Sequence, residues 1–333
     1  MPRPDQTIGQ SASASLLEVR YLDPHGGRIE CTDAANILGA VGFGVQRPGF
    51  LPLSCPFISA PLKSAMGSTN LEIWRTSSPC RAINFGPVTG ACGDHLAFGA
   101  IPLPETRTTS LEEIVEAAYL AIFDFLDASG FTAPLRFWNY LTKITQDDAG
   151  LERYRRFNVG RHRAFSKRLR EALPPAASGV GGNHGVSAIY FLAAREPAHP
   201  VENPRQISAF AYPPLYGPQS PSFSRASIFH HGGGDLMFIS GTASIVGHES
   251  RHAGNLHSQM AETVENLLAV IGAAGIAGLE DWAFKIYLRD PAYLDAVDLA
   301  LTASFGPAAR RLYLQGEICR AELVVEIEAF CHT

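Results

Sequence analysis

Two glutamates near the end of the chain have the spacing most suggestive of acid–base chemistry. Glu326 and Glu328 alternate with apolar residues in the segment 316–330, and this period of two is typical of a β-strand with two unlike faces. One face would carry Leu323, Val325, Ile327 and Ala329, and the other Glu322, Val324, Glu326, Glu328 and Phe330. Such acids lie either on a solvated face, where they form ordinary ion pairs, or in a pocket, where burial raises a carboxyl pKa. The pattern leaves both interpretations open.

Arginines that could bind an anion occur upstream in a predicted helical stretch, residues 150–179. Arg153, Arg156 and Arg161 lie within it. The stretch is either a solvated basic helix or one that turns an arginine inward to bind a carboxylate through two parallel hydrogen bonds.

The segment 202–227 is dense in proline, tyrosine and serine. Long loops in compact chains are usually functional or disordered, and aromatic residues among the prolines argue against disorder. We therefore predict a binding loop whose polar contacts are Tyr212, Tyr216 and Arg225.

Two other motifs resemble catalytic sites but lack the required context. Residues 248–252 match H-E-x-x-H, yet a strand pattern leads into them and Gly247 and Gly254 flank them, so we predict a loop and no zinc site. The glycines after His230 and His231 fit a tight turn, since no G-x-S-x-G motif accompanies them. Phosphate-binding glycine motifs do not occur, so we expect no nucleotide cofactor.

Composition narrows the class of protein further. With 27 Lys and Arg against 32 Asp and Glu, no basic bias toward nucleic acid exists. We expect no membrane partner and a cytoplasmic location, because no run of 18 apolar residues or secretory leader occurs. The six cysteines are scattered without a CxxC pair, so we expect them to be reduced.

The sequence indicates an internal repeat. A helical pattern ending near Gly130 precedes a strand pattern, and a second helical pattern ending near Gly275 precedes another. We predict an α+β fold of two related halves: 1–195, with the arginine-rich helical insert, and 196–333.

Segments of the second half resemble the YjgF/RidA family of small trimeric enzymes. The shared features are ISGT at 239–242, E-T-x-E-N at 262–266 and the closing E-I-E at 326–328. Together with the upstream arginine-rich and proline-rich segments, the whole chain resembles the chorismatases. The resemblance implies two RidA/YjgF-like (chorismate mutase-like) halves, each a mixed β-sheet with helices packed on one face.

This resemblance also implies an activity. Chorismatases release pyruvate from chorismate without a metal or cofactor, and Glu326 matches their catalytic acid. Candidates for binding the substrate are Arg289 first, then Arg153, Arg161 and Arg225, with Tyr140, Tyr212 and Tyr216. A RidA-type enamine or imine hydrolase and a non-catalytic small-molecule-binding protein are the alternatives. A monomer or a homotrimer is expected.

The product depends on two further positions. Cys319, seven residues before Glu326, resembles the branches that form 3-hydroxybenzoate, alone or with 4-hydroxybenzoate. In an unbroken strand these two residues would point to opposite faces, so a shared pocket requires a bulge or bend near 316–320. Ala243 is the candidate for a small residue that accompanies the cysteine.

Overall fold

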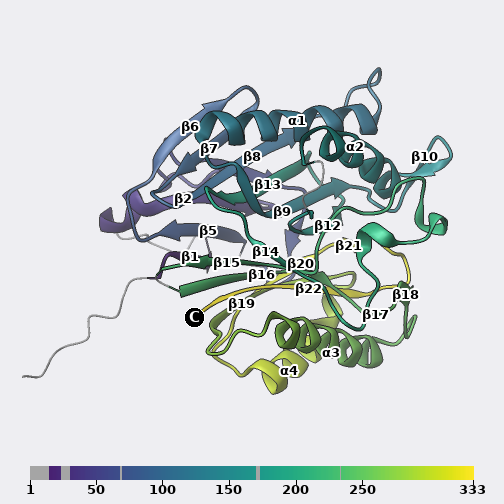
Figure 1. The fold of residues 1–333 in the computed structure, drawn as a ribbon. Coiled ribbons are helices and arrows are strands. Elements are labelled where there is room, and N and C mark those ends of the chain that lie inside the picture. Colours follow the sequence, from purple (N-terminus) through teal and green to yellow (C-terminus); the bar gives the residue numbers. More distant parts are fainter. Residues whose placement is uncertain (1–14, 24–30, 68–69, 170–172, 233) are drawn as a thin grey trace, which may run out of the picture.

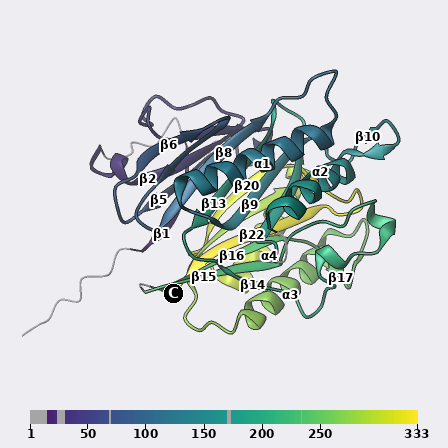
Figure 2. The same cartoon turned by 45° about the horizontal axis from the view of Figure 1, so that its top comes forward.

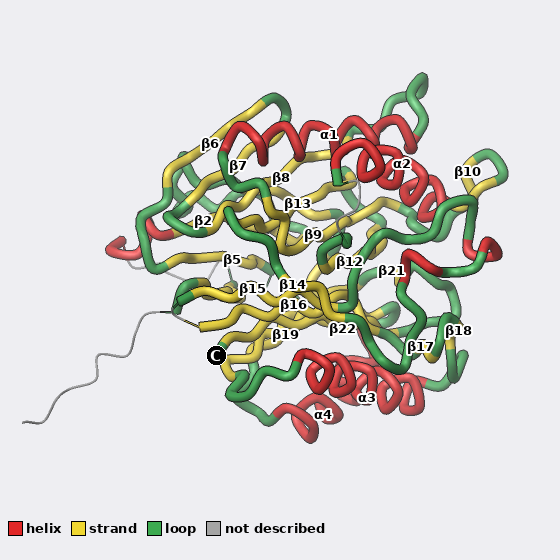
Figure 3. The backbone as a smooth tube through the Cα atoms, in the orientation of Figure 1, coloured by secondary structure: helices red, strands yellow, loops and turns green. Residues whose placement is uncertain are grey.

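Two large β-sheets lie face to face between two layers of helices (Figures 1 and 3). The computed structural model describes residues 15–23, 31–67, 70–169, 173–232 and 234–333. In strand order, the sheets are β21-β12-β9-β13-β8-β7-β6 and β14-β15-β16-β22-β19-β20-β4, and a smaller sheet, β1-β5-β2-β3, packs beside them. Helices α1 and α2 cover the first sheet and lie side by side, whereas α3 and α4 cover the second (Figure 2).

In chain order, the elements of the N-terminal part are β1 (Leu17–Leu22), η1 (Cys31–Asn36), β2 (Ile37–Phe43), β3 (Phe57–Ala60), β4 (Lys63–Ser64), β5 (Leu71–Thr76), β6 (Arg81–Phe85), β7 (Val88–Cys92), β8 (Leu96–Leu103), α1 (Leu111–Ser129), β9 (Ala133–Thr142), β10 (Asp147–Asp148), β11 (Leu151–Glu152), α2 (Arg153–Arg168), β12 (Ala176–Gly182) and β13 (Ser187–Ala194). The remaining elements are β14 (His199–Val201), η2 (Ala209–Ala211), η3 (Pro214–Tyr216), β15 (Ala226–His231), β16 (Gly234–Thr242), β17 (Ile245–Val246), β18 (Glu249–Ser250), α3 (Leu256–Ala274), β19 (Glu280–Leu288), η4 (Pro291–Tyr293), α4 (Leu294–Phe305), β20 (Arg310–Gln315), β21 (Glu317–Ile318) and β22 (Val325–His332).

The two halves have the same connectivity. The order β7-β8-β13-β9-β12 in one sheet matches β15-β16-β22-β19-β20 in the other, element for element along the chain. In each half a helix, α2 or α4, joins the two parallel strands, as a parallel crossover requires. The predicted α+β fold of two related halves is therefore confirmed. The boundary at 195/196 stays a prediction, since β4 and β21 each pair with the opposite half's sheet.

The predicted helix ends are also confirmed. Ser110 and Glu113 form a reciprocal capping box at the start of α1, and Asn255 caps α3. Gly130 and Gly275 end these helices in the left-handed conformation that glycine adopts without steric strain, with φ of 73° and 67°. None of the described helices combines the length and apolarity needed to cross a membrane.

A network of charged side chains is buried where the three sheets meet. Lys285 on β19 lies 2.6 Å from Glu72 on β5 and 3.1 Å from Glu328 on β22. Arg136 on β9 lies 2.9 Å from the other oxygen of Glu328. These side chains are at most 6% exposed, so each charge is removed from water and must be balanced within the network.

Hydrogen bonds from neighbouring aromatic side chains complete the network. Trp74 and Tyr190 each donate to Glu72 at 2.8 Å, and Trp138 donates to Glu328. Lys285 in turn donates to the hydroxyl of Tyr190 at 2.6 Å. The network thus links all three sheets through side chains that the surrounding apolar core excludes from solvent.

We expect Lys285→Met to lower the free energy of unfolding by about 3–5 kcal/mol, because Glu72 and Glu328 would lose their shared cation inside the protein. Urea denaturation followed by circular dichroism measures this loss. Adding Glu72→Gln to the same chain should restore part of it, since one unbalanced anion is removed. A loss below about 1 kcal/mol, as for an exposed ion pair, would contradict this account of the network.

Candidate active site

A cavity of about 250 Å³ opens at the end of the sheet interface and is formed by both halves. Glu326 of β22 and Gly241 of β16 come from one half, and Ser178 of β12 comes from the other. The loop that precedes β15 and the turn that precedes β22 close its sides. Its volume lies just below the range typical of small-molecule sites, about 300–1,000 Å³.

Glu326 presents its carboxyl group to this cavity. The side chain is 5% exposed, and the described residues provide no hydrogen-bond partner for it. Burial, and then the nearby Glu328 carboxylate, raise its pKa to about 8, against the opposing effect of Arg136 and Arg225. Glu326 is therefore protonated at neutral pH and can act as a proton donor.

Because Gly241 has no side chain, the Glu326 carboxyl group can occupy the space beside it. A Cβ atom at position 241 would lie 1.9 Å from Glu326 Oε1, closer than any side chain can approach. The pairing of β16 with β22 is irregular between Ile239 and Thr242, which places Gly241 at a break in the ladder.

Glu328 lies on the same strand face but in a different environment. Burial favours its neutral form, but Lys285 and Arg136, with hydrogen bonds from Ser178 and Trp138, lower the pKa of Glu328 below its usual value. Two carboxyl groups two residues apart are thus held in opposite protonation states.

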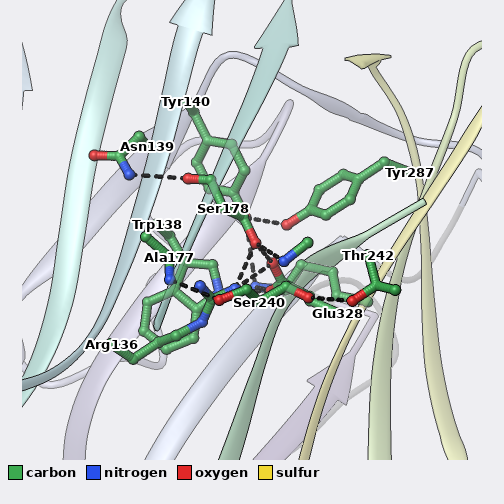
Figure 4. Close-up of polar contacts among 12 residues, drawn as sticks. Arg136, Trp138, Asn139, Tyr140, Ala177, Ser178, Ser240, Thr242, Tyr287 and Glu328 are labelled. Atoms are coloured by element: carbon green, nitrogen blue, oxygen red, sulfur yellow. Dashed lines mark hydrogen bonds and ion pairs between the residues drawn. The ribbon is translucent and has the colours of Figure 1, made fainter. Parts of the chain in front are cut away.

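Ser178 lines the cavity and also contacts Glu328, a contact that Figure 4 shows. Its hydroxyl donates to Glu328 at 2.6 Å and accepts hydrogen bonds from Arg136 and from the backbone N–H of Gly241, the latter at 2.9 Å. The charge network therefore reaches the cavity wall through one side chain.

Three arginines line the cavity, Arg155, Arg225 and Arg320, together with Glu152 and Glu322. Arg225 is 4% exposed; its Nη2 donates to Tyr212 Oη and to the carbonyl of Ile207, both at 2.9 Å. Its buried Nε has no partner in the described structure. Several cations around one small cavity suit a ligand with more than one carboxylate.

Two tyrosines of the predicted binding loop support these arginines. Tyr212 and Tyr216 pack with ring centroids 5.2 Å apart, and both line the cavity. The Arg320 guanidinium lies 4.3 Å above the Tyr216 ring, a cation–π contact, and Arg320 Nη1 donates to the carbonyl of His248 at 2.8 Å. The loop thus faces the cavity, as expected for a binding loop.

Cys319 reaches the same cavity as Glu326 because the chain is not one strand. The prediction of a continuous strand over 316–330 is wrong: β21 ends at Ile318, a turn follows, and β22 begins at Val325. This turn is the required bend between the two residues. Burial, and then the Glu326 carboxyl, raise the pKa of Cys319 to about 12, so it carries a neutral thiol. Ala243 also lines the cavity.

Four predicted substrate-binding residues do not line this cavity, contrary to their assignment. Arg289, the first candidate, donates to the carbonyls of Ile318, Arg320 and Leu323 and so holds the turn that carries Cys319.

The other three lie elsewhere in the fold. Arg153 pairs with Glu105 and donates to the carbonyl of Thr142. Arg161 is buried above the rings of Tyr119, Phe137 and Phe165, and Tyr140 hydrogen-bonds Tyr287 at 2.8 Å in the sheet interface.

Sequence reasoning missed Arg155, Arg320, Ser178 and Gly241. Arg155 stands between the candidates Arg153 and Arg156, and spacing alone does not select which of the three faces a cavity. Gly241 belongs to the ISGT segment, which by itself does not indicate what lies beside this glycine.

The H-E-x-x-H motif does not form a helix. Glu249 and Ser250 belong to β18, and His252 has a φ of 59°. His248 contacts the Tyr216 hydroxyl, whereas His252 lies beside Glu262. Within the described ranges, His, Cys, Asp and Glu side chains form no group of three suited to a metal ion.

Comparisons with known proteins agree with this architecture. The family model described as "Chorismatase FkbO/Hyg5-like, N-terminal" matches residues 72–193. A 3-hydroxybenzoate synthase from Streptomyces hygroscopicus is 34% identical over 310 residues, covering 88% of this chain and 91% of that protein. A chorismatase from Streptomyces rapamycinicus is 33% identical over 308 residues, covering 88% and 92%. A chorismatase crystal structure, 29% identical, superimposes with a TM-score of 0.85 over 96% of this chain and 100% of that one. With such relatives along nearly its whole length, the chain belongs to the chorismatase family.

Proposed function

We propose that this protein is an enzyme that converts chorismate to pyruvate and 3-hydroxybenzoate, with Glu326 as the general acid. The observation that carries the proposal is a protonated carboxyl group in a cavity lined by three arginines. Chorismate needs both features, because it carries two carboxylates and an acid-labile enol ether. The names of the relatives, 3-hydroxybenzoate synthase and chorismatase, support the same substrate.

In the first step, Glu326 gives its proton to the methylene carbon of the enolpyruvyl group. The ether bond to the ring then breaks with its electron pair going to oxygen, and pyruvate leaves. The ring cation that remains loses one proton to become aromatic, and the Glu326 carboxylate is the base available to take it. The cycle returns the acid to its starting state and consumes no water.

The fate of the ring hydroxyl decides the product. Direct loss of the proton from the carbon that bears this hydroxyl gives 4-hydroxybenzoate, whereas 3-hydroxybenzoate requires the oxygen to move to the carbon that carried the ether. A water molecule that enters instead gives the dihydroxycyclohexadiene carboxylate. We propose that Cys319 and Ala243, which line the cavity with Glu326, restrict the space available to such a water.

Substrate binding falls to the arginines of the cavity. We assign the two carboxylates of chorismate to the set Arg155, Arg225 and Arg320, with Tyr212 and Tyr216 fixing the orientation of Arg225 and Arg320. Arg289 positions the turn beneath them. A cytoplasmic location and a monomeric or homotrimeric state stay predictions.

We expect the purified protein, treated with chelator, to convert chorismate to equal amounts of pyruvate and hydroxybenzoate, mainly the 3-isomer. Cys319→Gln should keep chorismate consumption but shift the product toward the dihydroxycyclohexadiene carboxylate, because a polar amide can hold a water where the thiol does not. Chromatography of the reaction mixture measures both. Pyruvate formed without any hydroxybenzoate by the unmodified protein would contradict the assigned product.

We expect Glu326→Gln to lower kcat by about 10²–10⁴, because the amide keeps the shape but cannot donate a proton to carbon. In the unmodified enzyme, kcat/KM should fall above a pH of about 8, where Glu326 ionises. In the unfolded chain, Glu326 would ionise near pH 4.5. Because the folded protein keeps this proton up to a pH of about 8, the free energy of unfolding should fall as the pH rises from 4.5 to about 8.

The dependence of stability on the ionisation of Glu326 also provides a control for folding. Glu326→Gln has no carboxyl to ionise, so at pH 9 it should resist urea better than the unmodified protein. An active Glu326→Gln enzyme, or a rate that stays constant well above pH 8, would rule out Glu326 as the acid.

We expect Arg225→Lys to raise KM at least tenfold, because an ammonium group cannot make the paired hydrogen bonds of a guanidinium group. Arg168→Lys is the matched control, since Arg168 pairs with Asp124 and Asp127 on the outer helices and should leave KM unchanged. Steady-state kinetics on chorismate distinguish the two. Equal KM values in both variants would remove Arg225 from the binding site.

A further inference from the structure

Glu328 is shielded from the cavity by its hydrogen-bond partners. It is absent from the residues that line the cavity, and Ser178, Trp138, Arg136 and Lys285 surround its two oxygens. A substrate in the cavity would therefore meet Ser178 before it could reach Glu328. Any effect of Glu328 on the reaction must act through another group.

The charges of the network are balanced when Glu326 is neutral. Arg136 and Lys285 carry two positive charges, and Glu72 and Glu328 carry two negative charges. A proton lost from Glu326 would add a third anion beside these four groups. Of these, Glu328 lies two residues away on the same strand face.

Ionisable groups surround Glu326 on several elements. They are Glu328 on β22, Arg136 on β9, Arg225 before β15, Cys319 in the turn, Tyr154 on α2 and Tyr287 on β19, and the cavity is also lined by Glu152, Arg155, Arg320 and Glu322. Burial keeps the thiol of Cys319 and the hydroxyls of the two tyrosines neutral. Of the charges that act on the pKa of Glu326, that of Glu328 opposes its ionisation, while Arg136 and Arg225 favour it.

We propose that Glu328 is a positioning residue for the reaction: Lys285 and Arg136 hold it as an anion, and this fixed negative charge keeps the proton on Glu326. The inference rests on the proposed role of Glu326 as the acid. Lys285 acts indirectly, because it pairs with Glu328 but does not line the cavity, and its second partner is Glu72.

The test is the pH dependence of Glu328→Gln. This change removes the opposing charge and leaves Arg136 and Lys285 facing Glu326, so Glu326 should release its proton more readily. The alkaline limb of kcat/KM should move at least about one pH unit toward acid, within the range expected for a lost like charge. Activity lost at pH 8 should return when the pH is lowered, which a merely structural defect would not show.

Three further variants complete the experiment, two as controls and one as a substitute if Glu328→Gln is unstable. Glu116→Gln, a matched amide substitution at the exposed pair with Lys167, should leave the limb unchanged. Glu326→Gln should stay inactive at every pH. If Glu328→Gln folds poorly, Glu328→Gln with Lys285→Met removes one charge of each sign and should show the same acid shift.

Infrared difference spectra supply a readout that does not require turnover. The band of the protonated carboxyl that disappears in Glu326→Gln should titrate at lower pH in Glu328→Gln than in the unmodified protein. A reduced rate with the limb and the band unmoved would overturn the proposal while leaving the function of Glu326 intact. A shifted band in a protein that never consumes chorismate would instead refute the proposed function and leave the electrostatic inference standing.

Discussion

The interaction on which the structure most depends is the ion pairing of Glu328 with Lys285 and Arg136 between the two sheets. Removing several charges from water is expensive, and a pair of opposite charges recovers that cost only when hydrogen bonds satisfy the remaining atoms. Here indole, phenol and hydroxyl groups supply those bonds. Replacing such a buried network by well-packed apolar residues often costs a protein no stability, although removing one partner alone costs much. The network is therefore better explained by what it does to its neighbour Glu326 than by stability.

Two glutamates on one strand face obtain opposite properties from this arrangement. Glu328 pairs with the cations Lys285 and Arg136 and accepts further hydrogen bonds from Trp138 and Ser178, whereas Glu326 points into a cavity and receives no hydrogen bond from the described residues. Gly241 makes the difference possible, since a side chain there would occupy the space of the Glu326 carboxyl group. The site thus needs both halves of the fold: one carries both acids, and the other carries Arg136 and Ser178.

More of the fold than of the candidate site could be predicted from the sequence. Strand and helix periods, and the glycines that end α1 and α3, are local signals, so the repeat and the two related halves followed from them. The predicted site residues Glu326, Cys319, Arg225 and the two loop tyrosines lie together in one cavity. Arg289, Arg153, Arg161 and Tyr140 do not line it, because a side chain's direction depends on tertiary partners. Arg289, for example, could bind a carboxylate, but its guanidinium group instead donates hydrogen bonds to three backbone carbonyls. The turn between β21 and β22 was likewise hidden, since residues 319–324 continue the alternating pattern of the strand.

Neutron diffraction from a deuterium-exchanged crystal at pH 7 would test the central claim most directly, because it locates the protons of both carboxyl groups in one experiment. The account predicts deuterium on a Glu326 oxygen, none on Glu328, and a fully deuterated ammonium on Lys285. Deuterium on Glu328 with an ionised Glu326 would contradict it, because the network would then not hold the acid in its protonated state.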